Sequence, residues 1–210
     1  MDWTLYVITD AKLSRGRSHL EVAQAAIEGG ASIIQFREKE MTTRQLVETA
    51  EKIKELTEEA DIPLIINDRL DVALAVNADG VHVGQDDMPA ALARQLIGPH
   101  KILGVSASTV EEALQAEREG ADYVSASPVF TTPTKPDAPP PTGLEGLRAI
   151  VEAVNLPVIA IGGINEENVA EVIGAGAQGV AVISAVVSAP DIAAAAHRLR
   201  ETIEAARKGA

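Results

Sequence analysis

The feature that most limits the fold of this chain is a regular alternation of short apolar runs with longer stretches of helical spacing. The short runs lack the polar alternation of a half-exposed sheet, so we expect parallel strands that are covered on both faces. The eight expected strands are Leu5–Thr9, Ser32–Arg37, Pro63–Asn67, Gly80–Val83, Lys101–Ser106, Tyr123–Ser127, Pro157–Ile161 and Gly179–Ile183. Each is followed by a candidate helix, which predicts an α/β fold.

A weak internal repeat lies at the junctions that precede the even-numbered strands. Its four copies are Gly30–Ile33, Ala78–Val81, Gly120–Tyr123 and Gly176–Gly179. The alanines of successive copies are 47, 43 and 56 residues apart, which is close to two strand-helix units each time. An open doubly wound sheet has no reason to repeat in this way. The repeat therefore favours a closed eight-stranded β/α barrel, a TIM barrel, in which residues 1–210 form a single domain.

The composition agrees with this fold and excludes several kinds of chemistry. Hydrophobic residues make up 46% of the chain but aromatic residues only 2%, so the core must consist of aliphatic side chains. Barrel interiors are layered with such branched residues. Because there is no cysteine, disulfides, thiolate zinc sites and cysteine nucleophiles are excluded.

The charge and the apolar segments indicate where the protein acts. A formal net charge of -13 argues against nonspecific binding to nucleic acid or to an anionic membrane. The apolar run at residues 5–8 is too short for a secretory signal, and residues 180–189 are too few to span a bilayer. We expect a cytoplasmic protein without nucleic acid or membrane partners. The sequence leaves open whether copies assemble into a homo-oligomer.

Glycines and small residues follow the last two expected strands. Gly162 and Gly163 end the seventh, and the eighth leads into Ile183–Ala185. In barrels of this kind, the loops after these strands commonly bind phosphate through backbone N–H groups. The alternative is that Gly162 and Gly163 only form a tight turn, but their position in the fold favours a phosphate site.

Two aspartates follow adjacent strands. Asp68 comes after the third expected strand and Asp87 after the fourth, so both carboxylates can reach one hard cation. Mg²⁺ accepts one or two carboxylates and completes its coordination with water and phosphate oxygens. For a single Asp, a role in a turn or a helix cap would be the better interpretation. Two on neighbouring loops favour a magnesium site.

Basic residues gather at the same rim in an otherwise acidic chain. Arg37 and Lys39 follow the second strand, and Lys135 lies in a proline-rich stretch after the sixth that we interpret as an active-site loop. Local positive charge predicts an anion with several charges, such as pyrophosphate. The alternative is that these residues form surface salt bridges with Glu38 or Glu40.

Together these motifs resemble the thiamine phosphate synthase family along nearly the whole chain. The resemblance is specific because the motifs occur in the family's order. They are Tyr6–Asp10, Gln35–Lys39, Ile66–Arg69, His82–Asp87, Leu103–Ser106, Ile161–Ile164 and Val182–Ala185.

The resemblance implies a reaction between two phosphorylated small molecules. A hydroxymethylpyrimidine diphosphate is joined to a thiazole phosphate with magnesium as cofactor, which yields thiamine phosphate and pyrophosphate. It implies a dissociative path, in which the aminopyrimidine supports a methylene cation that the thiazole nitrogen then captures. A lone histidine within a strand is more often a hydrogen-bonded structural residue than a catalyst, and we interpret His82 in this way. Forming the carbon-nitrogen bond needs no general base, which fits a rim without an obvious catalytic histidine.

The family's residues can be carried over to matching positions. The resemblance implies that Asp68 and Asp87 hold magnesium on the diphosphate and that Gln35 orients the pyrimidine. Ser106 would face the reacting methylene or the diphosphate, and Arg37 and Lys135 join it as catalytic candidates. The remaining expected contacts are Lys39 and Asn67 to the diphosphate, Thr132 and Thr134 to the thiazole phosphate, and the backbone of Gly163, Ile183 and Ser184 to its phosphate group.

The chain departs from the family pattern in one loop, and the pattern leaves alternatives. Ser127 stands where relatives often have glycine, and Thr131 where many have proline. A related thiazole tautomerase shares the barrel but tends to carry histidine at the position of Pro128, and here Pro128, Thr134 and Lys135 favour the synthase. A noncatalytic barrel that binds thiamine precursors would not require the two aspartates. The fold also admits phosphosugar isomerases, but these need a carboxylate or histidine base beside the sugar, and the sequence offers no equally coherent set of residues for that role.

Overall fold

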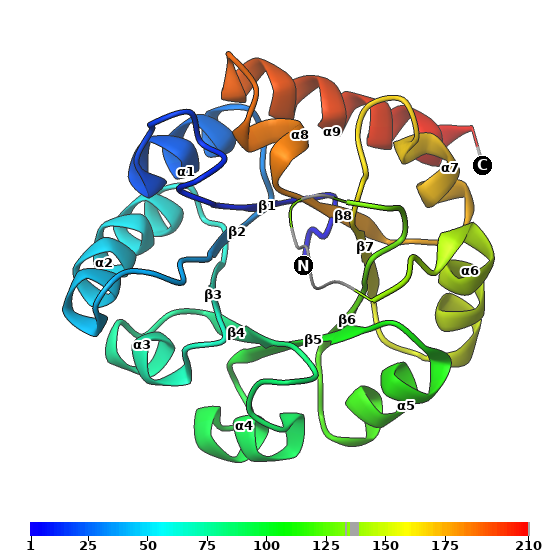
Figure 1. The fold of residues 1–210 in the computed structure, drawn as a ribbon, viewed down its shortest axis with the longest axis horizontal. Coiled ribbons are helices and arrows are strands. Elements are labelled where there is room, and N and C mark those ends of the chain that lie inside the picture. Colours follow the sequence, from blue (N-terminus) through cyan, green and yellow to red (C-terminus); the bar gives the residue numbers. More distant parts are fainter. Residues whose placement is uncertain (133, 135–138, 210) are drawn as a thin grey trace.

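The computed structural model describes residues 1–132, 134 and 139–209, and it shows a closed barrel of eight parallel strands (Figure 1). The strands are β1 (Leu5–Ile8), β2 (Ile33–Phe36), β3 (Leu64–Asn67), β4 (Gly80–Val83), β5 (Ile102–Ala107), β6 (Tyr123–Ala126), β7 (Val158–Ile161) and β8 (Gly179–Val182). They pair in chain order, and β8 closes the barrel against β1. The predicted strands are confirmed, with ends that differ by at most one residue.

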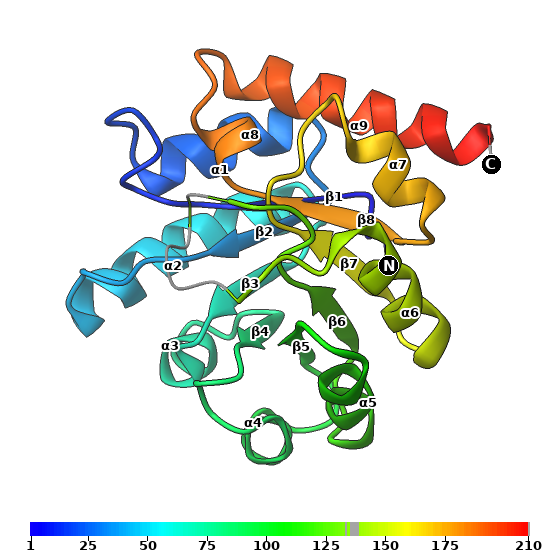
Figure 2. The same ribbon diagram turned by 45° about the vertical axis from the view of Figure 1, so that its right-hand side comes forward.

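The helices form a ring around the barrel, as Figure 1 shows. They are α1 (His19–Glu28), α2 (Thr43–Glu59), α3 (Leu70–Ala75), α4 (Ala90–Ile97), α5 (Val110–Arg118), α6 (Gly143–Ala153), α7 (Val169–Gly174), α8 (Ser184–Val187) and α9 (Ile192–Lys208). The short α8 follows β8 directly, and the long α9 then packs against both α1 and α7 (Figure 2). The end of the chain thus covers the seam at which the barrel closes.

The internal repeat connects neighbouring strands at their amino ends, which form the bottom of the barrel. The residue before each repeat alanine has a positive φ and follows the preceding helix; these residues are Gly30, Asn77, Gly120 and Gly176. The next residue in each copy is a buried alanine. In three copies the side chain that follows accepts a hydrogen bond from an N–H at the start of the preceding odd-numbered strand. These bonds join Ser32 to Leu5, Asp79 to Leu64 and Asp122 to Leu103, over 2.8–3.0 Å.

The core has two layers. The larger lies between the sheet and the helices and consists mainly of valine, isoleucine, leucine and alanine. The smaller fills the barrel interior, where the buried rings of Tyr6 and Tyr123 lie among isoleucines. Gly104 faces Tyr123 so closely that an added Cβ would lie 2.1 Å from the ring. A glycine on β5 therefore leaves the space in which this ring sits.

No helix in the described part of the chain is long and apolar enough to cross a membrane.

We expect Gly104→Ala to lower the free energy of unfolding by about 1–3 kcal/mol, because the new methyl group would overpack the interior against Tyr123. Equilibrium unfolding in urea measures this change. Gly174→Ala is the matched control, since nothing lies within 4 Å of its added Cβ and it sits at the end of α7. Equal stability of Gly104→Ala and the wild type would contradict the packing argument.

Candidate active site

A cavity of about 990 Å³, including its open mouth, lies at the carboxyl ends of the strands. Every site residue predicted from the sequence lines it except Lys135, which lies outside the described residues. The predicted residues that line it are Gln35, Arg37, Lys39, Asn67, Asp68, Asp87, Ser106, Thr132, Thr134, Gly163, Ile183 and Ser184. Their convergence follows from the parallel strands, whose carboxyl ends share one rim.

Asp68 occupies a backbone conformation that aims its carboxylate into the cavity. Its φ is 59°, a left-handed value that costs energy for a residue with a side chain, and its N–H donates to the His82 carbonyl over 2.8 Å. Lys39 Nζ lies 2.5 Å from Asp68 Oδ2. Burial raises the pKa of Asp68; the Lys39 ammonium opposes this rise, and the nearby Asp87 carboxylate adds to it.

Asp87 is fixed by the turn that follows β4. Its Oδ2 accepts a hydrogen bond from the Gly84 N–H over 2.8 Å. Two oxygen-donor side chains, Asp68 and Asp87, thus share one corner of the cavity, and their proximity raises the pKa of Asp68. This donor set fits a hard divalent cation that takes its other ligands from water or phosphate. Among the described residues, no further acidic residue and no histidine lies close enough to these two aspartates to form a group of three metal ligands.

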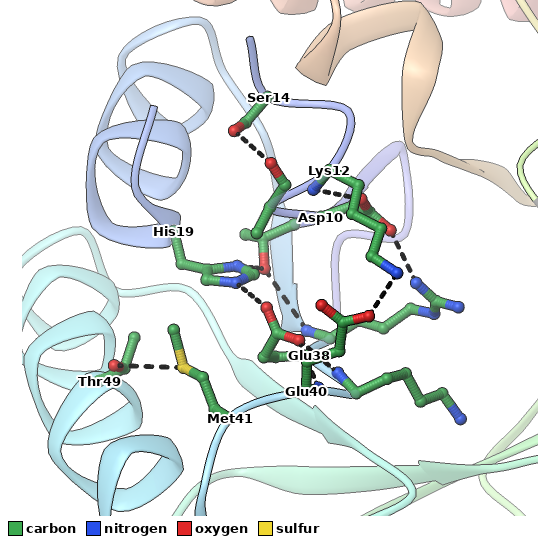
Figure 3. Close-up of polar contacts among 12 residues, drawn as sticks. Asp10, Lys12, Ser14, His19, Glu38, Glu40, Met41 and Thr49 are labelled. Atoms are coloured by element: carbon green, nitrogen blue, oxygen red, sulfur yellow. Dashed lines mark hydrogen bonds and ion pairs between the residues drawn. The ribbon is translucent and has the colours of Figure 1, made fainter. Parts of the chain in front are cut away.

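Arg37 is held at the rim by an acidic partner. Its Nη1 lies 2.7 Å from Asp10 Oδ2. Asp10 Oδ1 also accepts hydrogen bonds from the N–H groups of Lys12, which Figure 3 shows beside it, and of Leu13. The loop after β1 therefore positions a guanidinium from the loop after β2. A guanidinium has five N–H donors, so this ion pair leaves others for a ligand.

A buried histidine anchors the segment that carries Arg37 and Lys39. His19 Nε2 lies 3.0 Å from Glu38 Oε2 and its Nδ1 lies 2.8 Å from Thr9 Oγ1 (Figure 3). The other carboxylate oxygen of Glu38 accepts the N–H groups of Lys39 and Glu40. These bonds lower the pKa of Glu38 although burial raises it. Sequence reasoning did not find this network, because Thr9, His19 and Glu38 meet only when β1, α1 and β2 pack.

The side chains of Arg37 and Lys39 do not form salt bridges with Glu38 or Glu40, which was the alternative to a binding role. Arg37 pairs with Asp10 and Lys39 with Asp68, while Glu40 pairs with Lys12. Arg37 and Lys39 both line the cavity. The structure thus brings positive charge and carboxylates together at one rim.

Ser106 is reached by a hydrogen-bonded histidine from the neighbouring strand. His82 Nε2 lies 2.8 Å from Ser106 Oγ, and His82 Nδ1 lies 2.8 Å from the Tyr123 hydroxyl. Burial lowers the pKa of His82 to about 4. His82 is hydrogen-bonded as we expected, but it also lines the cavity, which the sequence interpretation left out. Its place on the inner face of β4, opposite Asn67 of β3, was the available indication.

The opposite side of the cavity is formed by backbone. Gly162 and Gly163 have φ values of 102° and 67° and pack against the loop after β6. A Cβ on Gly162 would lie 2.5 Å from the Pro128 Cβ, so only glycine fits there. Ile183 and Ser184, at the start of α8, line the same side. The Gly-Gly pair is therefore more than a tight turn, since it allows a close approach of two loops at the rim.

The loop after β6 is paired to β7. Val129 N–H donates to the Ile161 carbonyl and Phe130 N–H to the Gly162 carbonyl, over 2.8 and 3.0 Å. This pairing holds Thr132 at the cavity, where Thr132 Oγ1 accepts a hydrogen bond from the Thr134 N–H. The departures at Ser127 and Thr131 leave a loop that reaches the cavity, with Ser127 itself among the lining residues.

A TIM barrel whose rim combines a pair of neighbouring carboxylates, basic side chains and glycine-supported backbone is an enzyme-like fold suited to phosphorylated small molecules. A family model described as thiamine monophosphate synthase matches residues 5–186. The chain belongs to the thiamine monophosphate synthase family.

Individual relatives align over nearly their whole lengths. A thiamine-phosphate synthase from Chloroflexus aurantiacus is 60% identical, with 100% of this chain and 97% of the relative covered. One from Moorella thermoacetica is 58% identical and covers 98% of each chain. The solved structure of a thiamine phosphate pyrophosphorylase from Pyrococcus furiosus is 47% identical and aligns with a TM-score of 0.91 over 98% of this chain and 97% of that one.

The raised pKa of Asp68 makes a prediction about stability. The folded protein binds this proton more tightly than the unfolded chain, so the free energy of unfolding should fall as pH rises from the ordinary value of 3.8 through the higher folded value. Asp68→Asn should remove this decline and be more stable than the wild type at neutral pH. Urea unfolding across the acidic to neutral range measures both.

Asp71→Asn serves as the control, because the Arg69 guanidinium lowers the pKa of Asp71. Its small contribution has the opposite sign, since it is present above 3.8 and is lost as pH falls through the lower folded value. A wild-type stability that does not decline relative to Asp68→Asn would contradict the assignment of a destabilised carboxylate.

Proposed function

We propose that this protein joins a hydroxymethylpyrimidine diphosphate to a thiazole phosphate, forming thiamine phosphate and releasing pyrophosphate. Relatives that are 60% and 58% identical carry the name thiamine-phosphate synthase. The observation that carries the proposal is the convergence of the predicted residues, from Gln35 to Ser184, on one cavity. Membership of the family and the chemistry of the rim point to the same substrates, which are phosphorylated small molecules.

We assign departure of the diphosphate to the side of the cavity formed by β2 to β5. Arg37 and Lys39 would neutralise the charge that develops on the leaving group, and Asn67 would hold its oxygens. Their acidic partners, Asp10 and Asp68, fix the two cations before substrate binds. This arrangement supports catalysis by positioning and electrostatic stabilisation. Lys135 stays a predicted contact outside the described residues.

Asp68 and Asp87 are the residues that would hold a magnesium ion. When bound, such an ion would screen the negative charge of the diphosphate. The adjacent carboxylates and the raised pKa of Asp68 support this assignment, because a cation would relieve the repulsion between them. Lys39 now supplies positive charge to Asp68, so it would turn toward the diphosphate when that corner is filled.

The remaining residues would hold the two organic parts. Gln35 lies deep in the cavity, where it would orient the pyrimidine, and Ser106 would face the methylene or the diphosphate. The thiazole phosphate would lie across the barrel, at Thr132 and Thr134, with its phosphate against the backbone of Gly163, Ile183 and Ser184. We also propose a cytoplasmic location and leave homo-oligomerisation as an open prediction.

The reaction can be tested by mixing both substrates with and without Mg²⁺ and measuring pyrophosphate and thiamine phosphate together. We expect the two products in equal amounts and only with the metal. Conversion of a thiazole phosphate tautomer without coupling would instead indicate the tautomerase reaction. Binding of both substrates without turnover would indicate a noncatalytic barrel.

We expect Asp87→Ala to lower kcat at least about a hundredfold while the protein stays folded, because the leaving group would lose part of its charge stabilisation. Asp87→Asn is a sharper variant, since its amide oxygen can still accept the Gly84 N–H while the charge is lost. Steady-state kinetics and thermal unfolding measure the two effects, with the exposed Asp71→Asn as control. Wild-type turnover in both Asp87 variants would remove the metal assignment.

A further inference from the structure

Five side chains from five strands form one hydrogen-bonded chain through the barrel interior. Gln35 Nε2 lies 2.7 Å from the Tyr6 hydroxyl, which lies 2.9 Å from the Tyr123 hydroxyl. Tyr123 continues to His82 Nδ1 over 2.8 Å, and His82 Nε2 reaches Ser106 Oγ over 2.8 Å. The strands, in this order, are β2, β1, β6, β4 and β5.

Three members of this hydrogen-bonded chain line the cavity, and the two tyrosines do not. Gln35, His82 and Ser106 are among the lining residues, whereas Tyr6 and Tyr123 lie below them and are 1% and 0% exposed. Among the described residues no buried side-chain polar atom lacks a hydrogen-bond partner. Both hydroxyls are buried and take their hydrogen bonds from this chain, so the loss of one link would leave a buried polar group without that partner.

When both tyrosine hydroxyls donate, the number of protons makes every hydrogen bond in the chain run in the same direction. Each tyrosine hydroxyl donates once, and a neutral imidazole carries one N–H and one acceptor nitrogen. If Gln35 donates to Tyr6, the Tyr6 hydroxyl donates to Tyr123 and Tyr123 donates to His82 Nδ1. The proton of His82 then lies on Nε2 and is donated to Ser106 Oγ. The Ser106 hydroxyl is left free to donate into the cavity.

Only one other arrangement makes every link and also lets both buried tyrosine hydroxyls donate, and it is the complete reverse. In it Ser106 donates to His82 Nε2, and each later bond turns round until Tyr6 donates to the amide oxygen of Gln35. The amide oxygen and nitrogen of Gln35 exchange places between the two arrangements. A donor at the Ser106 end therefore requires that the Gln35 oxygen be turned toward the cavity.

We propose that this chain couples the two ends of the pyrimidine diphosphate site, so that a diphosphate oxygen accepting from Ser106 sets Gln35 to accept an N–H from the ring. Tyr6 and Tyr123 are then positioning residues, which act on the substrate without touching it. The inference rests on the proposed function for the identity of the ligands. It adds a rule of specificity, since an anion at one end selects a ring that offers a donor at the other.

The tautomer of His82 is the direct readout. In the wild-type protein with pyrophosphate and Mg²⁺, ¹⁵N NMR of the histidine side chains should show His82 protonated at Nε2 and unprotonated at Nδ1. The His82→Asn variant identifies the resonance. An Nδ1-protonated His82 in this complex would overturn the proposal, and the tautomer itself is read on the wild-type protein.

Gln35→Glu should reverse the chain. At mildly alkaline pH the introduced carboxylate can only accept, so Tyr6 must donate to it and the proton of His82 must move to Nδ1. Ser106 then donates to His82 and is lost as a donor to the anion. We expect pyrophosphate with Mg²⁺ to bind about tenfold more weakly, measured by calorimetry, with the change in tautomer seen by NMR.

Breaking the hydrogen-bonded chain distinguishes the loss of the Ser106 donor from simple repulsion between the introduced carboxylate and pyrophosphate. In a Tyr123→Phe background, or in a Tyr6→Phe background should the first not fold, Gln35→Glu should weaken pyrophosphate binding by only about twofold, because neither end then senses the other. Thr57→Val removes a buried hydroxyl in α2, away from the chain, and should leave binding unchanged. The same loss with the chain intact and broken would overturn the coupling.

These measurements use pyrophosphate binding and a histidine tautomer, so they do not depend on turnover. If the wild type forms no thiamine phosphate, the proposed function fails, while the tautomer still reports on the chain. If the wild type is active but His82 shows the wrong tautomer, only the coupling fails.

Discussion

The pairing of β8 with β1 is the constraint on which the rest of the structure depends. With the ring closed and every strand parallel, all the carboxyl ends lie on one rim, and loops far apart in the chain become neighbours. Asp68 and Ser184 line the same cavity only for this reason. The side chains that follow the repeat alanines hold the opposite end together, where Asp79 and Asp122 tie the bottoms of β3 and β5. One end of the barrel is thus built for stability and the other for ligands.

Charge at the rim is arranged in pairs. In a chain with a net charge of -13, Arg37 and Lys39 would be drawn to many carboxylates, yet each is held by one partner beside the cavity. Asp10 is itself held by backbone N–H groups, and Glu38 is held by His19. Residues outside the cavity therefore position the basic side chains that line it. This organisation lowers the reorganisation needed when a polyanion binds. Its local cost is the left-handed backbone and raised pKa of Asp68.

The barrel interior contains polar side chains that form hydrogen bonds with one another. Barrel cores are usually filled by aliphatic layers, and here isoleucines do surround Tyr6 and Tyr123. The upper layer departs from this rule with Gln35, His82 and Ser106, because it is also the floor of the cavity. A floor made of hydrogen-bonded side chains has few allowed proton arrangements. The same bonds that satisfy buried hydroxyls therefore restrict what the floor can offer to a ligand.

The sequence by itself determined the elements and the set of rim residues. Unbroken apolar runs, helical spacing and the repeated alanines were enough to predict eight strands and closure, because burial patterns are local properties of a chain. The positions of Asp68, Asp87 and Gly163 after strands were enough to gather them, since parallel strands end together. Lys135 could be named from its motif, but it lies outside the described residues.

Only the tertiary structure decided which atoms meet. No spacing in the sequence pairs Arg37 with Asp10 or His19 with Glu38, because these contacts depend on loop paths and on how α1 packs. His82 looked like an isolated strand residue until β4, β5 and β6 placed it between Ser106 and Tyr123. Side-chain direction within a closed barrel is set by register and by the space that residues such as Gly104 leave. Those are properties of the packed molecule, and the local sequence does not contain them.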